Sequence, residues 1–278
     1  MLIDTHAHLN FSAFNKDRNE IIKKCLDNNV WVVNVGTNLK TSKEAAGLAK
    51  KYEQGIYSAV GLHPMNLETG LVKIKADVNE RKSIESDFNY EKYKDLAKSK
   101  KVVAIGEIGL DYYWRPKTKV KKELFKQKQK DLLLEQLKLA KELDLPVIFH
   151  CRMANHDLFN ILSENPDLRP KKAVAHSFVG SVDDIRKHID LGYYIGFNGI
   201  IFKNIEGIDF EKIIKATPLE KILIETDCPY LAPPQVQTKR NQPIFVKYVA
   251  QEIARTKNMD FEKVEEVTTE NAKTLFGI

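Results

Sequence analysis

Short apolar segments alternate along the chain with longer segments in which apolar residues recur every three or four positions. The short segments are apolar almost throughout, which is typical of strands buried in a parallel sheet, and the longer ones have the period of amphipathic helices. The predicted strands are residues 2–4, 31–35, 56–60, 101–106, 146–150, 173–176, 193–197 and 222–227. The predicted helices are residues 17–29, 41–52, 89–99, 119–143, 155–164, 181–191, 210–216, 242–257 and 261–276.

Eight strands, each followed by helical sequence, predict an α/β protein with the closed (β/α)8 architecture of a TIM barrel. The length of 278 residues suits one such barrel, and no linker or internal repeat interrupts the chain, so we expect a single domain over residues 1–278. The alternative is an open doubly wound sheet. It is disfavoured because no Gly-x-Gly-x-x-Gly sequence follows an early strand.

Composition and charge narrow the class of protein only a little. The net charge of +6 is compatible with a polyanionic partner, but we interpret the lysines of residues 117–130 as a solvated helix face. The three cysteines, Cys25, Cys151 and Cys228, are too widely spaced for a disulfide framework or a zinc ribbon. The sequence contains neither a secretory leader nor an apolar run of membrane-spanning length, so we expect a cytoplasmic protein without membrane contacts.

Polar residues gather where the predicted strands end, and the carboxyl ends of barrel strands are where TIM barrels carry their active sites. Five of the seven histidines are among them. His156 and His188 lie in helices, and we interpret them as surface or packing residues. Any one strand-end residue could be a satisfied core histidine or a turn carboxylate, but their convergence favours a functional site. The set consists of His6, His8, His63, Glu107, His150, His176 and Asp227.

The donor types in this set indicate metal binding. His6 and His8 are two residues apart, so an extended backbone directs both imidazoles to one side. Four imidazoles and two carboxylates are too many for one tetrahedral zinc ion and suit two divalent cations that share a carboxylate. We assign His6, His8 and Asp227 to one cation and His150 and His176 to the other. Glu107 is the expected bridge.

Sequence motifs around these positions resemble those of the TatD-type metal-dependent deoxyribonucleases of the amidohydrolase superfamily. The resemblance runs in order along nearly the whole chain. The matching stretches are Asp-Thr-His-Ala-His-Leu at 4–9, Gly-Leu-His-Pro at 61–64, Gly-Glu-Ile-Gly-Leu-Asp-Tyr at 106–112, Phe-His-Cys-Arg at 149–152, His-Ser-Phe-Val-Gly at 176–180, Glu-Thr-Asp-Cys-Pro-Tyr-Leu at 225–231, and Arg240, Asn241 and Pro243.

This resemblance implies a TIM barrel that hydrolyses phosphodiester bonds from the 3′ end of DNA with divalent metal ions (Mg, Mn or Zn) on the six ligands above. The sequence departs from the family pattern at Met65, Ser177 and Gln242. The polar stretch 65–88 is also longer and more charged than the resemblance leads us to expect. These departures leave the metal ligands intact and leave the substrate preference open.

A mechanism and a set of substrate contacts follow as hypotheses. The cations lower the pKa of a bound water, whose proton Asp227 accepts, while His63 donates a hydrogen bond to the phosphate or to the leaving oxygen. Arg152 follows His150 by two residues and could grip a phosphate, as could Arg240 and Asn241. The remaining expected contacts are aromatic side chains that could stack on a terminal base, namely Tyr112, Tyr113 and Trp114.

The mouth of a barrel is a pit, and an intact duplex is too broad to bring an internal phosphate to its floor. We therefore expect an exonuclease that prefers single-stranded or frayed DNA ends, with RNA as a further possible substrate. A second hypothesis keeps the metal site and changes the substrate, as in a D-aminoacyl-tRNA deacylase. A third is a non-catalytic binding protein, which the complete set of ligands disfavours. The sequence does not indicate the oligomeric state.

Overall fold

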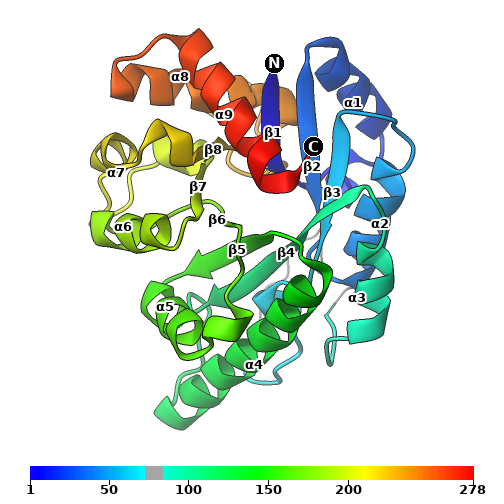
Figure 1. Ribbon diagram of the computed structural model, residues 1–278, viewed down its shortest axis with the longest axis vertical. Coiled ribbons are helices and arrows are strands. Elements are labelled where there is room, and N and C mark those ends of the chain that lie inside the picture. Colours follow the sequence, from blue (N-terminus) through cyan, green and yellow to red (C-terminus); the bar gives the residue numbers. More distant parts are fainter. Residues whose placement is uncertain (73–83) are drawn as a thin grey trace.

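A computed structural model describes residues 1–72 and 84–278 of the chain, and it contains one eight-stranded parallel sheet. The strands follow one another in chain order around the sheet (Figure 1). Their bounds are β1 Leu2–Ala7, β2 Val30–Val35, β3 Ile56–Val60, β4 Val102–Asp111, β5 Val147–Arg152, β6 Ala173–Ala175, β7 Tyr194–Phe197 and β8 Ile222–Ile224.

The first and last strands meet and close the sheet into a barrel. Thr5 Oγ1 donates to the Ile224 carbonyl at 3.0 Å, and the His8 amide donates to the Cys228 carbonyl at 2.9 Å. An isolated parallel bridge joins Ala7 to Cys228. This closure confirms the (β/α)8 barrel and excludes the open doubly wound sheet.

Helices follow the strands and surround the barrel in the described ranges (Figure 1). Their apolar faces pack against the outer side of the sheet, and the inner side packs on itself. Their bounds are α1 Arg18–Asp27, α2 Leu39–Ala49, α3 Tyr90–Ala97, α4 Lys119–Leu143, α5 Asn155–Glu164, α6 Val182–Asp190, α7 Phe210–Ala216, α8 Val246–Lys257 and α9 Phe261–Phe276.

The core inside the barrel is sealed at the amino-terminal end of its strands. Inward-facing residues such as Ile3, Val33 and Leu223 form one cluster with Leu275 and Phe276 of α9. The last helix therefore covers the amino-terminal end of the barrel. Polar side chains occupy the opposite end, where the strands finish.

Several predicted boundaries differ from the structure, among them the end of β8, which stops at Ile224 rather than at residue 227, and two of the differences have identifiable reasons. Strand β4 does not stop before Glu107 but continues to Asp111, because Glu107 is a buried strand residue surrounded by imidazoles rather than a loop residue. Helix α2 begins earlier than expected because its N-cap is Asn38, whose side chain accepts a hydrogen bond from the Thr41 amide at 2.9 Å. Residues 73–83 of the polar stretch 65–88 lie outside the described residues.

His156 and His188, the two histidines expected outside the site, lie in helices as a surface residue and a packing residue. The side chain of His156 on α5 is 84% exposed. His188 on α6 is fully buried and packs against Phe159, Phe178 and Tyr193. No helix within the described ranges combines the length and the apolar character needed to cross a membrane.

Candidate metal centre

The pairing of the strands becomes irregular at two positions that carry predicted metal ligands. The β1–β2 register shifts between Asp4 and Ala7, around His6. The β4–β5 register shifts between Ile105 and Ile108, around Glu107. Such irregularities redirect side chains, and here both redirected residues belong to one cluster at the carboxyl end of the barrel.

The two histidines of β1 converge through their Nε2 atoms, which lie 3.2 Å apart. His8 Nδ1 lies 2.9 Å from the Val35 carbonyl, to which it can only donate, so a neutral His8 carries its proton on Nδ1. The Nε2 lone pair of His8 therefore faces the cluster. His6 is fully buried, and its Nδ1 has no hydrogen-bond partner among the described residues.

Glu107 lies at the centre of the cluster, and its two carboxylate oxygens face different groups of imidazoles. Oε2 lies 3.4 Å from His6 Nε2. Oε1 lies 2.7 Å from His150 Nδ1, 3.5 Å from His63 Nε2 and 3.7 Å from His176 Nε2. One carboxylate thus joins the histidines that arrive from four different strand ends.

Asp227 closes the cluster from the end of β8. Its Oδ1 lies 3.2 Å from His8 Nε2 and 3.9 Å from His6 Nε2. Its backbone has a φ of 56°, a left-handed conformation that aspartate tolerates better than most residues. The Asp227 amide donates to the His6 carbonyl at 2.8 Å, so the turn that aims this carboxylate is fastened directly to β1.

Two further buried carboxylates stand behind the histidines, and neither is among the site residues predicted from the sequence. Asp111 Oδ2 lies 3.1 Å from His150 Nε2, and Glu225 Oε1 lies 2.8 Å from His176 Nδ1. The sequence offered a signal for both: Asp111 is four residues after Glu107, and Glu225 is two residues before Asp227 in the strand predicted over 222–227, although β8 itself ends at Ile224. Even spacings in extended backbone direct side chains to the same face.

The buried charges perturb several ionisation equilibria in the cluster. Burial raises the pKa of Glu107, but the surrounding imidazoles, His63 and His176 foremost, outweigh it and hold that pKa well below its usual range. Burial lowers the pKa of His150, but Asp111 and Glu107 raise it to about 10. The negative charge of these buried carboxylates is therefore stabilised by positive charge nearby, either protons on the imidazoles or bound cations.

The donor set fits divalent cations. Three groups of ligand atoms lie within 4.8 Å of one another: His6, His8 and Glu107; His6, His176 and Asp227; and His63, Glu107 and His150. The groups overlap, and they differ from the assignment predicted from the sequence, because His176 groups with His6 and Asp227 rather than with His150. His6 directs its Nε2 at two carboxylates and an imidazole, which is the orientation of a metal ligand.

His63 differs from the other histidines of the cluster. Its Nδ1 accepts a hydrogen bond from the Met65 amide at 3.1 Å, so in the neutral ring the proton is on Nε2, which faces Glu107. Burial and the neighbouring His150 lower its pKa to about 4. A neutral imidazole with Nε2–H directed into the cluster is a hydrogen-bond donor, as the sequence analysis expects, and not a metal ligand in this orientation.

The residues expected to contact substrate fall into two groups. Tyr113 and Arg152 are exposed beside the site, and the Arg152 guanidinium lies 3.7 Å from the centre of the Tyr113 ring. Tyr112, by contrast, is 7% exposed and donates through its hydroxyl to Asp157 at 2.9 Å.

Arg240 and Asn241, the other two residues expected to contact substrate, bind instead to other groups within the protein. Arg240 forms a bidentate ion pair with Asp17 and donates to the Ala13 carbonyl at 2.6 Å. Asn241 is fully buried, and its side-chain amide donates to the Thr226 carbonyl at 2.9 Å and accepts from the Gln242 amide at 2.9 Å. Both hold the segment that follows β8, which includes Asp227.

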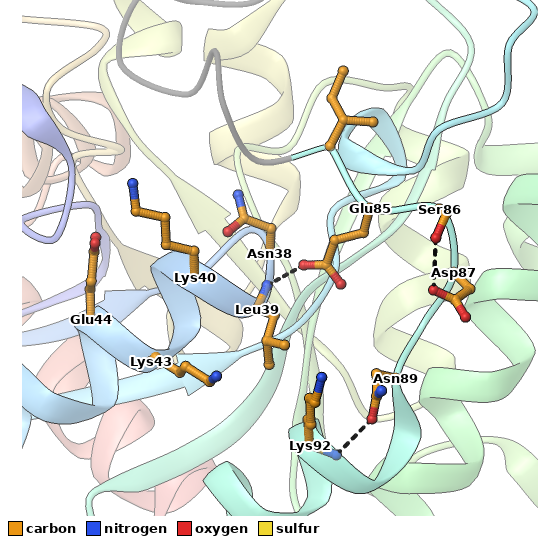
Figure 2. A pocket seen from close by; sticks show the side chains of 11 residues that line it. Asn38, Leu39, Lys40, Lys43, Glu44, Glu85, Ser86, Asp87, Asn89 and Lys92 are labelled. Atoms are coloured by element: carbon orange, nitrogen blue, oxygen red, sulfur yellow. Dashed lines mark hydrogen bonds between the residues drawn. The ribbon is translucent and has the colours of Figure 1, made fainter.

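A surface cavity of about 670 Å³ lies beside the start of α2 and contains no residue of the metal cluster (Figure 2). Glu85 crosses it to accept hydrogen bonds from the Leu39 amide and from the Tyr93 hydroxyl. Figure 2 shows lysines and carboxylates around the same cavity, so its charge is mixed. The lining residues are Asn38, Leu39, Lys40, Lys43, Glu44, Ile84, Glu85, Ser86, Asp87, Asn89 and Lys92.

Comparison with known proteins gives matches over the full chain. The family model of TatD related DNases matches residues 3–277. The uncharacterized metal-dependent hydrolase YabD of Bacillus subtilis is 38% identical over 281 residues, which cover 100% of both chains. The 3'-5' ssDNA/RNA exonuclease TatD of Shigella flexneri is 32% identical, with 100% of this chain and 99% of that one covered. The crystal structure of the TatD homologue YJJV from Escherichia coli has a TM-score of 0.83 at 30% identity and covers 100% of this chain and 98% of its own.

Proposed function

Because this chain belongs to the family of TatD-related DNases and is a metal-dependent hydrolase of that family, we propose that it hydrolyses phosphodiester bonds at the ends of single-stranded DNA with two divalent cations. The observation that carries the proposal is the geometry of Glu107. Its Oε2 faces His6, and its Oε1 faces His150 and His176. A carboxylate with a different set of imidazoles at each oxygen is suited to bridge two cations.

The ligands of these cations would be His6, His8, His150, His176, Asp227 and the bridging Glu107. When bound, divalent cations polarise a phosphate oxygen and lower the pKa of a bound water towards neutrality. Asp227 is 18% exposed at its side chain, which makes it the ligand carboxylate most open to the barrel mouth, and it accepts the proton of the attacking water. Its low pKa, held down chiefly by His8 and His176 against the effect of burial, keeps it ionised for that role.

His63 and Arg152 act on the phosphate. His63 Nε2–H donates to a phosphate oxygen or to the leaving oxygen, and its pKa of about 4 keeps the ring neutral at physiological pH. Arg152 is exposed at the end of β5, two residues beyond His150, and contacts an adjacent phosphate. Phosphate contacts of this kind position the strand and carry no sequence information.

The preference for ends and the 3′ direction have different supports. The preference for ends follows from the position of the cluster at the mouth of the barrel, where His6, His8, Glu107 and His176 are buried and an intact duplex does not reach them. The 3′-to-5′ direction and the inclusion of RNA follow from relatives that are named 3'-5' ssDNA/RNA exonucleases.

Two substrates test the proposal. A linear single strand labelled at its 3′ end should lose its label first, before the same strand labelled at its 5′ end. A covalently closed single-stranded circle, which has every phosphodiester bond but no terminus, should be resistant. Cleavage of the circle at the rate of the linear strand would refute the argument from ends, and no release of nucleotides from either DNA would favour the deacylase hypothesis.

A variant tests the bridging role of Glu107 separately. Glu107→Ala should fold, because the barrel closes elsewhere, but it should bind less than two metal ions per chain and lose turnover. The control is Glu44→Ala, an exposed carboxylate on α2 outside the cluster. Two bound metals and full turnover in Glu107→Ala would refute the bridging role of Glu107.

A further inference from the structure

The first turns of α4 extend beyond the end of the barrel beside the metal cluster. The Gln129 side chain holds the end of β4, since its Oε1 accepts from the Asp111 amide at 2.8 Å and its Nε2 donates to the Asp111 carbonyl at 3.0 Å. The ten helical residues before Gln129 therefore rise about 15 Å past the level of Asp111. Of residues 119–124, none is buried, and Figure 1 shows one end of α4 extending past α5.

This overhang and the loop before it, residues 113–128, carry an unusual charge. The segment contains seven cationic side chains and one acid, a net charge of +6, which equals the net charge of the entire chain. The other 262 positions of the sequence therefore carry no net charge in total. Of the seven cations, Lys117, Lys119, Lys121 and Lys122 make no ion pair among the described residues. The interpretation of these lysines as a merely solvated face does not explain why the charge is concentrated at the mouth.

Exposed aromatic rings stand at the base of the overhang. Tyr113 is 48% exposed and Trp114 is 42% exposed, and the two rings meet edge to face with centres 5.2 Å apart. The Arg152 guanidinium covers one face of Tyr113 at 3.7 Å. Adjacent exposed rings of this size can mark an interaction site, and aromatic side chains stack on unpaired nucleobases.

The aromatic pair is fastened to the metal cluster by a short chain of contacts. The Tyr113 amide donates to Asp111 Oδ1 at 2.9 Å, and the other oxygen of that carboxylate lies 3.1 Å from His150. Asp111 pairs with Arg152 in the β4–β5 register. Tyr113 and Arg152 therefore lie two residues, or about 7 Å, beyond Asp111 and His150, which is about the length of two stacked nucleotides.

We propose that residues 113–128 form the binding surface for the part of a single-stranded nucleic acid that remains outside the pit, with Trp114 and Tyr113 stacking on its bases and Lys117, Lys119 and Lys121 contacting its phosphates. This inference rests on the proposed function, because it assumes that the strand enters the metal cluster. It adds the path of the strand and a reason for preferring unpaired bases, since the faces of bases inside a duplex are already covered by the neighbouring base pairs. The stacking is tolerant of sequence.

The chain offers a direct spectroscopic test because it has only two tryptophans, Trp31 and Trp114. Trp31 is at the start of β2, at the opposite end of the barrel from the cluster. In a Trp31→Phe variant loaded with metal, an oligothymidylate with hydrolysis-resistant phosphorothioate linkages should quench the fluorescence of Trp114. An abasic oligonucleotide of equal length should bind more weakly and leave the fluorescence unchanged. Trp114→Ala should weaken binding of the oligothymidylate about 5- to 100-fold.

A matched pair of charge variants tests the phosphate contacts on the same helix. Lys119→Gln/Lys121→Gln changes the overhang, and Lys138→Gln/Lys141→Gln changes two exposed lysines near the other end of α4 by the same charge. The slope of log affinity against log salt should fall by about 1.4 in the first variant and stay unchanged in the second. Equal changes in both variants, or an unquenched Trp114, would overturn the proposed surface.

The outcome separates this inference from the proposed function. Hydrolysis of a normal single strand with no quenching of Trp114 would refute the surface and leave the proposed function standing. Quenching and a specific salt effect without hydrolysis would refute the proposed function and leave a nucleic-acid-binding surface.

Discussion

Replacing His188 should change how the stability of the protein depends on pH. This imidazole is fully buried on α6, both of its nitrogens lack a hydrogen-bond partner among the described residues, and its neighbours are Phe159, Phe178 and Tyr193. Burial lowers its pKa to about 4 from an ordinary value of 6.5. His188→Leu removes the titrating group and keeps an apolar side chain in the same space.

The magnitude follows from the difference between the two pKa values. Between pH 6.5 and pH 4 the unfolded chain binds a proton at this position and the folded chain does not, so the wild type loses stability as the pH falls through that window. At about 1.4 kcal/mol for each pH unit, the full loss is about 3 kcal/mol. Above pH 6.5 the ring is neutral in both states and makes no such contribution.

The assay is urea unfolding of the wild type and the variant from pH 7.5 to pH 4. The free energy of unfolding of His188→Leu, minus that of the wild type, should grow by about 3 kcal/mol as the pH falls from 6.5 to 4. The control is His156→Leu, which makes the same replacement at a histidine whose side chain is 84% exposed. A constant difference between His188→Leu and wild type over the whole range would refute the reasoning.

Three further variants test the neighbourhood of the metal cluster. Glu225→Gln should weaken metal binding about 10- to 100-fold, because Glu225 Oε1 lies 2.8 Å from His176 Nδ1 and orients that ring. Titration of the metal measures the affinity, and an unchanged affinity would contradict this role. His63→Ala should lower turnover about 100-fold while two metals remain bound, and loss of metal would make His63 a ligand. Arg240→Ala should cost about 1 kcal/mol of stability through its ion pair with Asp17. A double-mutant cycle with Asp17→Ala should show the two effects to be non-additive, and additive effects would argue against that pairing.

The barrel and the convergence of the predicted histidines and carboxylates at one end of it could be predicted because both depend on local sequence. Apolar strand segments and helix periods give the units, and parallel strands bring their carboxyl ends together without any knowledge of side-chain packing. His6, His150 and Asp227 were identified in this way, although they are far apart in the sequence. The strand ends were less predictable, because Glu107 is polar and buried, and a polar residue in an apolar run looks like the end of a strand.

The pattern of apolar and polar positions could not predict which side chains from distant segments contact each other. The ion pair of Arg240 joins residues 223 positions apart, so nothing near Arg240 in the sequence indicates that its charge is already matched. Tyr112 and Tyr113 are neighbours with similar local sequence, but one is buried against Asp157 and the other is exposed. Which of two adjacent rings faces the solvent depends on the packing of α4 and α5.

The closure of the barrel also sets the order in which the protein can acquire activity during synthesis. His6 and His8 leave the ribosome almost at once, but Asp227 and the backbone groups of β8 that fasten it to β1 come more than 200 residues later. A nascent chain therefore carries the histidines of the first strand for most of translation without the carboxylate that completes their cluster. Fragments that end before β8 should therefore be inert, and the hydrolase gains its activity only when its fold is nearly finished.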